Sequence, residues 1–219
     1  GRMPPSIVVR PVVRSFPARL IHEAAAHVRR GGHAVLWGRA KKRKRAWLLF
    51  PVPKEDDPHD LSYFAVLDLG KQRFRSAQRG PGKGLATTLV PPDCHDIVRR
   101  RAERDKPHRG ATRRLELDCT TCAACCRSNR VELDRDDIER FEGGGRADLA
   151  RAPYARRSDG KLVLSLTSSR TCVHLRADER CGIYSLRPEM CRVFPEGSEC
   201  CLSARAEEFD LHDGARPVE

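Results

Sequence analysis

The chain has 219 residues, enough for one large domain or two small ones. Hydrophobic residues make up 39% and charged residues 33%, which predicts a polar globular protein with a modest apolar core. No stretch approaches the ~18 consecutive apolar residues that indicate a membrane span, and the first residues lack the apolar run of a signal peptide. We therefore expect a cytoplasmic protein, in which ten cysteines indicate metal ligands or redox thiols rather than disulfides.

The net charge of +12 favours contact with phosphates, acidic proteins or anionic lipid, without choosing among them. The densest basic runs are residues 41–45 and 99–101. A solvated turn and a solvated helix face are the commoner explanation of such runs, and binding of nucleic-acid phosphates is the alternative. Aromatic residues are only 5% of the chain, so stacking platforms for single strands would be sparse.

The first 108 residues predict a small basic α/β domain. Apolar residues recur at helical spacing over residues 17–30, and Gly31 and Gly32 end that helix. Three short apolar runs then predict antiparallel strands, at residues 34–37, 46–52 and 63–69.

A glycine-rich loop over residues 79–83 and a basic helix over residues 93–104, capped by Asp93, complete this part. A polar break with proline and glycine follows at residues 105–110, so we expect two domains, 1–108 and 109–219. We recognise no family in the first domain.

The second domain is expected to be small, cysteine-rich and stabilised by metal. Residues 115–117 are extended, and residues 133–141 predict a helix with acidic residues in its first turn that stops at Gly143. Residues 161–167 alternate as in a strand, and residues 203–209 form a last helix. The predicted fold class of the whole chain is α+β, with short helices and few strands.

Nine of the ten cysteines lie in this second domain. They begin with C-T-T-C-A-A-C-C from Cys119, a spacing shared with the first three ligands of a bacterial ferredoxin run and, at its start, with zinc knuckles. Because neighbouring side chains diverge, we expect Cys125 and Cys126 to serve different centres, or one of them to be structural. Cys94 is expected to be structural, Cys200 has a duplicate beside it, and His174 is either a nitrogen ligand or a structural histidine.

Four segments resemble the YkgJ-type family of zinc- or iron-chelating cysteine-cluster proteins, which is distantly similar to the cysteine-rich part of flagellin lysine N-methylase. The segments are the C-x-x-C-x-x-C-C run from Cys119, the helix start at residues 133–138, the stretch from Cys172 to Cys191, and C-L-S-A-R from Cys201. They cover about residues 111–212, and C-G-I-Y-S-L-R-P-E-M-C is the most specific of them. The resemblance implies eight metal ligands: Cys119, Cys122, Cys125, Cys126, Cys172, Cys181, Cys191 and Cys201.

Two further residues bear on the site. Ala123 stands where the family often has glycine, which leaves the turn geometry open. Arg187 could neutralise a negatively charged thiolate centre and so help to bind the cofactor, or could pair with a surface carboxylate.

The leading hypothesis is a metal-binding protein that holds an iron–sulfur cluster, preferably 4Fe–4S, or zinc, in a structural, electron-transfer or metal-handling role. Thiolate ligands permit both metals, and the ferredoxin-like spacing favours iron–sulfur. One alternative is a redox or protein-modifying enzyme that depends on the cluster, although no nucleophile elbow or H-E-x-x-H motif indicates an active site. Another is a nucleic-acid-binding protein that works through its basic half, and a protein partner is expected but not identified.

Overall fold

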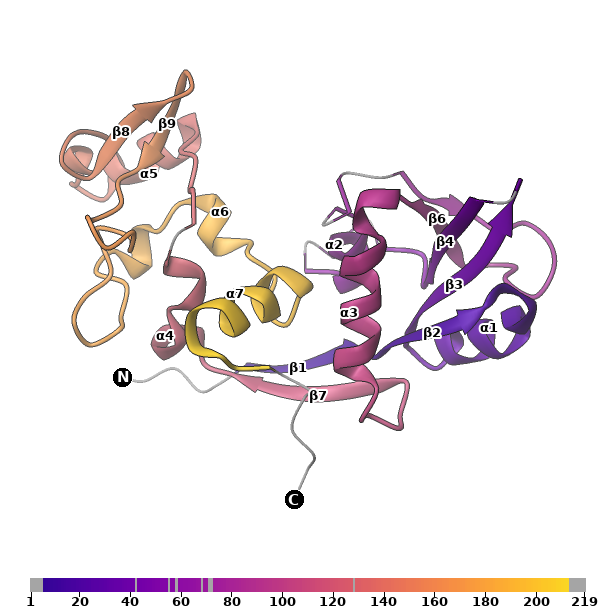
Figure 1. The fold of residues 1–219 in the computed structure, drawn as a ribbon. Coiled ribbons are helices and arrows are strands. Elements are labelled where there is room, and N and C mark those ends of the chain that lie inside the picture. Colours follow the sequence, from indigo (N-terminus) through magenta and orange to yellow (C-terminus); the bar gives the residue numbers. More distant parts are fainter. Residues whose placement is uncertain are drawn as a thin grey trace. The chain divides into compact units, whose positions relative to one another are not determined.

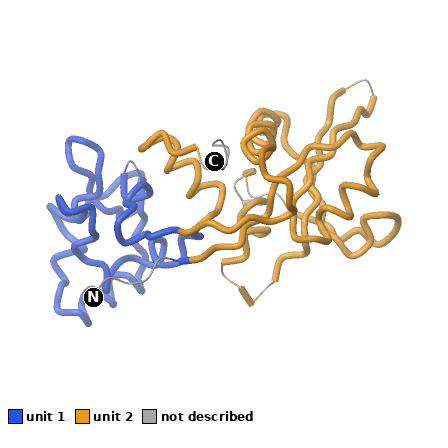
Figure 2. The backbone as a smooth tube through the Cα atoms, turned by 90° about the horizontal axis from the view of Figure 1, so that it is seen from below, with its two compact units in different colours: residues 1–6, 117–196 blue, residues 7–116, 197–219 orange. Residues whose placement is uncertain are grey.

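The computed structural model describes residues 6–41, 43–54, 56–57, 59–67, 69–70, 73–127 and 129–212. The chain forms two compact units (Figure 2). The sheet unit consists of residues 7–116 and 197–219, and the cysteine unit of residues 1–6 and 117–196. The domain division at residue 108 stays a prediction, and Lys42, in the first basic run, lies outside the described residues.

A five-stranded mixed sheet organises the sheet unit. Its strand order is β2-β3-β4-β6-β5, in which β2 runs parallel to β3 and the other neighbours are antiparallel. A separate two-stranded sheet pairs β1 (Ser6–Pro11) with β7 (Thr112–Leu117). The bounds of the five strands are β2 Val13–Pro17, β3 His33–Ala40, β4 Arg43–Phe50, β5 Arg75–Ser76 and β6 Ala86–Val90.

Helices cover both faces of this sheet (Figure 1). On one face, α1 (Ile21–Arg29) contributes Val28 to a core that also contains Leu36. On the other face, α2 (Leu61–Leu67) and α3 (His95–Asp105) contribute to a core around Phe50, which is completely buried. Successive residues of β3 alternate between the two cores because side chains of a strand point to opposite faces. The parallel β2–β3 pair needs a crossover, and α1 supplies it.

Most elements predicted for this part are confirmed. The helix over residues 17–30 is observed as a 3-10 turn, Ala18–Leu20, followed by α1. The strands at residues 34–37 and 46–52 correspond to β3 and β4, which are antiparallel. The basic helix is α3, and the loop at residues 79–83 is a series of turns.

Two local predictions are wrong. Residues 63–69 do not form a strand: the described part of this run lies mainly in α2, whose start is held by Asp60, because its Oδ1 accepts the Ser62 N–H at 2.7 Å. Short apolar runs fit a buried helix as well as a strand. Asp93 does not cap α3, because it lies within a preceding 3-10 turn, Pro92–Cys94, and Cys94 occupies the capping position without a side-chain hydrogen bond.

The cysteine unit has several short helices and few strands, and the chain as a whole is α+β. Its helical elements are α4 (Cys119–Cys122), η3 (Ala124–Cys126), α5 (Arg135–Gly143), η4 (Ala147–Ala150), η5 (Tyr184–Leu186) and α6 (Glu189–Arg192). The antiparallel pair β8 (Ala155–Ser158) and β9 (Lys161–Leu164) forms a hairpin. Phe141 and Leu149 are completely buried at the centre of its core.

The predicted helix at residues 133–141 is α5, which starts with a reciprocal capping box between Asp134 and Asp137. The predicted strand at residues 161–167 is β9. The last helix, α7 (Glu199–Phe209), begins four residues before the predicted start because Ser198 caps it. No helix formed by the described residues is both long enough and apolar enough to cross a membrane.

Candidate metal centre

Thiols from distant parts of the sequence surround one cavity in the cysteine unit. The cavity has a volume of about 110 Å³. Apolar side chains such as Leu164, Ile183 and Phe194 form much of its remaining wall. Six of the eight predicted ligands line it: Cys119, Cys125, Cys126, Cys172, Cys181 and Cys191.

The first cysteines are positioned by two tight turns. Asp118 caps α4 by accepting the Thr120 N–H at 3.0 Å, which places Cys119 at the start of the helix. Ala123 then adopts the left-handed conformation, with φ 53° and ψ 5°, and leads directly into η3. A non-glycine residue is strained there by about 1–2 kcal/mol, which explains why glycine suits this position.

Cys125 and Cys126 do not diverge as expected. Both line the cavity, and their thiols lie close enough to influence each other. The interaction with the Cys125 thiol, together with burial, raises the pKa of Cys126 well above its usual value. The two adjacent thiols therefore face one site, with η3 presenting both to it.

Backbone N–H groups near the next two cysteines favour their thiolate forms. The N–H groups of His174 and Leu175 lower the pKa of Cys172, and the Ile183 N–H lowers that of Cys181. The Leu175 N–H also donates to the Cys172 carbonyl oxygen at 2.9 Å. Burial raises the pKa of Cys172 to about 11, and these backbone donors act in the opposite direction because they favour the thiolate. The two turns thus carry donors suited to anionic sulfur.

Cys191, on α6, faces three of these thiols. Burial, together with the neighbouring groups Cys126, Cys172 and Cys181, raises its pKa to about 12. This mutual influence indicates that the four sulfur atoms lie near one another, because such interactions weaken with distance.

Arg187 provides positive charge at the same place. Its guanidinium carbon lies 3.9 Å from the centroid of the Tyr184 ring, and its charge lowers the pKa values of Cys126, Cys181 and Cys191. Its Nε atom is buried and has no hydrogen-bond partner among the described residues. Buried donors without partners are uncommon and costly.

Arg127 is a second cation that sequence reasoning missed. It lowers the pKa of Cys126 and forms a salt bridge with Glu179, with the nearest atoms 2.6 Å apart. Its position directly after the C-x-x-C-x-x-C-C run is the sequence feature that could have predicted a cation here.

His174 also lines the cavity and is only 7% exposed. Its ring stacks on Tyr154 with centroids 5.2 Å apart, and burial lowers its pKa. Its Nε2 atom is buried without a hydrogen-bond partner among the described residues. The stacking fits a structural histidine, which was one of the two sequence interpretations.

The remaining cysteines are placed elsewhere. Cys122 lies on α4 but is not among the described residues that line the cavity. Cys201 lies on α7 in the sheet unit, where it is 7% exposed, and Cys200 beside it is exposed. Cys94 packs against the core of the sheet unit.

Among the described residues, no three histidine, cysteine or acidic side chains are arranged to hold a metal ion. The thiols thus share a cavity without converging on one point. The chemistry of the donor set nevertheless fits zinc or an iron–sulfur cluster, because both are bound by thiolates and neither requires oxygen ligands.

Residues 118–213 match the family model described as "CxxCxxCC: Putative zinc- or iron-chelating domain". This part of the chain is thus similar to the CxxCxxCC family. No curated protein and no solved structure matches the chain. The CxxCxxCC match agrees with the resemblance found in the sequence, and it includes α7 as well as the cysteine unit.

Proposed function

We propose that the CxxCxxCC domain binds metal through cysteine thiolates at this cavity, in a structural, electron-transfer or metal-handling role. The observation that carries the proposal is that six thiols from residues 119–191 line one cavity, with backbone N–H groups that favour the thiolate forms of Cys172 and Cys181. Cys122 and Cys201 complete the proposed ligand set on the strength of the family resemblance.

The chain's own residues account for how anionic sulfur would be stabilised. Burial raises the pKa values of Cys172, Cys181 and Cys191, so these thiols stay protonated without a counter-charge. A bound cation supplies that charge and displaces the protons, which makes binding stronger at higher pH. Arg187 and the backbone donors would then offset the negative charge left on the thiolate centre.

We favour an iron–sulfur cluster, specifically 4Fe–4S, over zinc. The support is the ferredoxin-like spacing of Cys119, Cys122 and Cys125 together with the N–H donors and the Arg187 cation, since charge and hydrogen bonds to sulfur tune such clusters. A cluster of this kind supplies one-electron redox chemistry when bound. Whether the protein uses it in an enzymatic reaction, and its cytoplasmic location, stay predictions.

Anaerobic purification from metal-replete cells tests the proposal. Iron, acid-labile sulfide and zinc are measured, and a visible absorption spectrum separates a coloured cluster from colourless zinc. The variants Cys172→Ser and Cys191→Ser should lose most of the metal, whereas Cys94→Ser and Cys200→Ser should retain it. Absence of all three elements from the wild-type protein, or equal loss in all four variants, would contradict the assignment.

A second candidate function is nucleic-acid binding by the sheet unit, favoured by the surroundings of Trp37. Lys44 Nζ lies 5.1 Å and the Arg99 guanidinium carbon 5.3 Å from the centroid of its ring, and His95 packs edge-on at 5.4 Å. An aromatic ring among cations can stack on bases beside their phosphates. Retention on RNA or DNA should fall steeply with salt, and no retention at low salt would exclude this candidate.

A further inference from the structure

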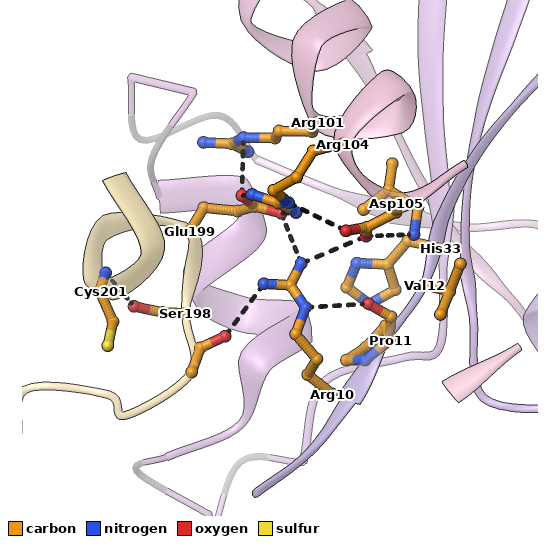
Figure 3. Close-up of polar contacts among 12 residues, drawn as sticks. Arg10, Pro11, Val12, His33, Arg101, Arg104, Asp105, Ser198, Glu199 and Cys201 are labelled. Carbon is orange, nitrogen blue, oxygen red and sulfur yellow. Dashed lines mark hydrogen bonds and ion pairs between the residues drawn. The ribbon is translucent and has the colours of Figure 1, made fainter. Parts of the chain in front are cut away.

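A network of buried charges fixes the start of α7 to the rest of the sheet unit (Figure 3). Glu199 is 6% exposed, and its carboxylate accepts hydrogen bonds from Arg10 at 2.7 Å and from two nitrogens of Arg104 at 2.5 and 2.9 Å. Arg104 also donates to Asp105, which is completely buried and accepts the Val13 N–H at 2.9 Å. Arg104 is therefore fully engaged within the protein and holds Glu199 in place.

A cleft of about 210 Å³ lies beside this network, between α3 and α7. Each helix lines it with residues three and four positions apart, which form one helical face. A cavity needs about 10–15 Å³ to hold one water molecule, so the cleft has room for a larger ligand. The polar residues that line it include Arg100, Arg101, Arg104, Glu199 and Ser203.

The described residues that line the cleft carry three guanidinium groups and one carboxylate, that of Glu199. Arg101 and Arg104 both approach this carboxylate, at 3.5 and 2.5 Å. The neighbouring carboxylate, Asp105, is within 3.6 Å of Arg10 and 3.9 Å of Arg113 in addition to its contact with Arg104. His212 also lines the cleft and pairs with Asp210 at 2.6 Å. Cationic donors therefore outnumber carboxylates among the described residues of this lining.

The guanidinium groups of the lining differ in their exposure to solvent. The Arg100 side chain is exposed, whereas that of Arg101 is only 12% exposed and approaches Glu199 to 3.5 Å. A partly desolvated arginine binds an anion more strongly than an exposed one, because the local dielectric is lower. Planar guanidinium groups match phosphate oxygens with two parallel hydrogen bonds.

We propose that the cleft between α3 and α7 binds a small phosphate dianion, either inorganic phosphate or the phosphate group of a monoester. Arg100 and Arg101 contact its oxygens, Ser203 donates a hydroxyl hydrogen bond, and the Arg104–Glu199 pair holds the wall of the cleft in shape. The site goes beyond metal binding and is built from the sheet unit alone, so neither proposal depends on the other.

Isothermal titration calorimetry on the full chain tests the site at low ionic strength. The probes are inorganic phosphate and glycerol 3-phosphate, which separate free phosphate from a monoester. We expect one saturable site for at least one probe. Arg100→Gln should weaken binding about tenfold or more, as expected for loss of a charge-assisted hydrogen bond, and Arg100→Lys should weaken it less because the charge is retained.

Arg99→Gln is the matched control, because it removes the same charge from the same helix. Arg99 pairs with Asp96 and lies over Trp37, and it is not among the described residues that line the cleft. Its binding constant should stay within about twofold of the wild type, since its charge is exposed and screened. Both arginines are exposed, so neither variant should unfold, and thermal melting verifies this.

Three results would overturn the proposal. One is the absence of saturable binding of both probes at millimolar concentration. Another is an equal loss of affinity in Arg99→Gln and Arg100→Gln, which would indicate diffuse electrostatic attraction. The third is binding of an oligonucleotide without binding of either small phosphate, which would assign the basic surface to nucleic acid.

Discussion

Replacing Glu199 by glutamine tests whether the buried charge network stabilises the sheet unit. The substitution keeps the shape of the side chain but removes the negative charge that Arg10 and Arg104 share. Glutamine retains one acceptor oxygen, yet the two guanidinium groups lose their common counter-charge. Arg10 is only 3% exposed and cannot turn to solvent without disrupting its surroundings.

The expected loss is about 3 kcal/mol of unfolding free energy. Removing one partner of a buried ion pair costs roughly 3–5 kcal/mol, and glutamine falls at the lower end because it preserves packing and one hydrogen bond. For a protein of this size, 1 kcal/mol shifts the melting temperature by about 2–4 °C. The melting temperature should therefore fall by about 6–12 °C.

Tryptophan fluorescence is the appropriate assay, because both tryptophans of the chain, Trp37 and Trp47, lie in the sheet unit. Glu103→Gln is the matched control: its side chain is 67% exposed and lies 3.6 Å from Lys106, so its loss should cost less than about 1 kcal/mol. If Glu199→Gln melts within about 2 °C of the control, the network does not contribute the stability assigned to it.

Three further outcomes follow from particular residues. Ala123→Gly should stabilise the cysteine unit by about 1 kcal/mol, because glycine relieves the strain of the left-handed conformation. Ala124→Gly, at a buried position, should destabilise the unit. Amide exchange within the unit should therefore be slower in Ala123→Gly and faster in Ala124→Gly, and faster exchange in Ala123→Gly would contradict the prediction. Arg187→Gln should lose metal to a chelator faster than the wild type, with Arg187→Lys intermediate; identical release rates would exclude a role for its charge at the thiols. Burial, with the nearby charge of Arg10, lowers the pKa of His33 to about 3, so below about pH 6.5 the unfolded chain binds a proton that the folded chain does not. Unfolding free energy should therefore fall by up to about 1.4 kcal/mol per pH unit between pH 6.5 and 3, and denaturant unfolding of His33→Asn should show a flatter profile.

The candidate metal centre was more predictable from the sequence than the sheet that precedes it. Fixed spacing and a specific string such as C-G-I-Y-S-L-R-P-E-M-C indicated the family whose model matches residues 118–213, and six of the eight predicted ligands line one cavity. Cysteine spacing is informative because few other arrangements require it. The sequence did not predict that Cys125 and Cys126 line the same cavity. They follow a left-handed turn at Ala123, and alanine gives no sequence signal of such a turn.

The sheet was harder to predict because its signals are nonlocal or ambiguous. The run at residues 63–69 is apolar enough for a strand or a helix, and the Asp60 contact that starts α2 is a local detail outside the run. β1, β2 and β6 were not predicted at all. β2 gains its place through parallel pairing with β3 across α1, a tertiary arrangement that a pattern of single residues does not encode.

The return of α7 to the sheet unit affects how the protein can be divided for experiments. Residues 117–196 are an insertion between two stretches that complete the same unit. A fragment that ends before Glu199 leaves Arg10 and Arg104 without their shared carboxylate, and a fragment that starts at residue 109 carries that carboxylate without either arginine. The proposed metal binding and phosphate binding are therefore best measured on the intact chain, and a shortened cysteine unit should be designed to leave α7 with the sheet.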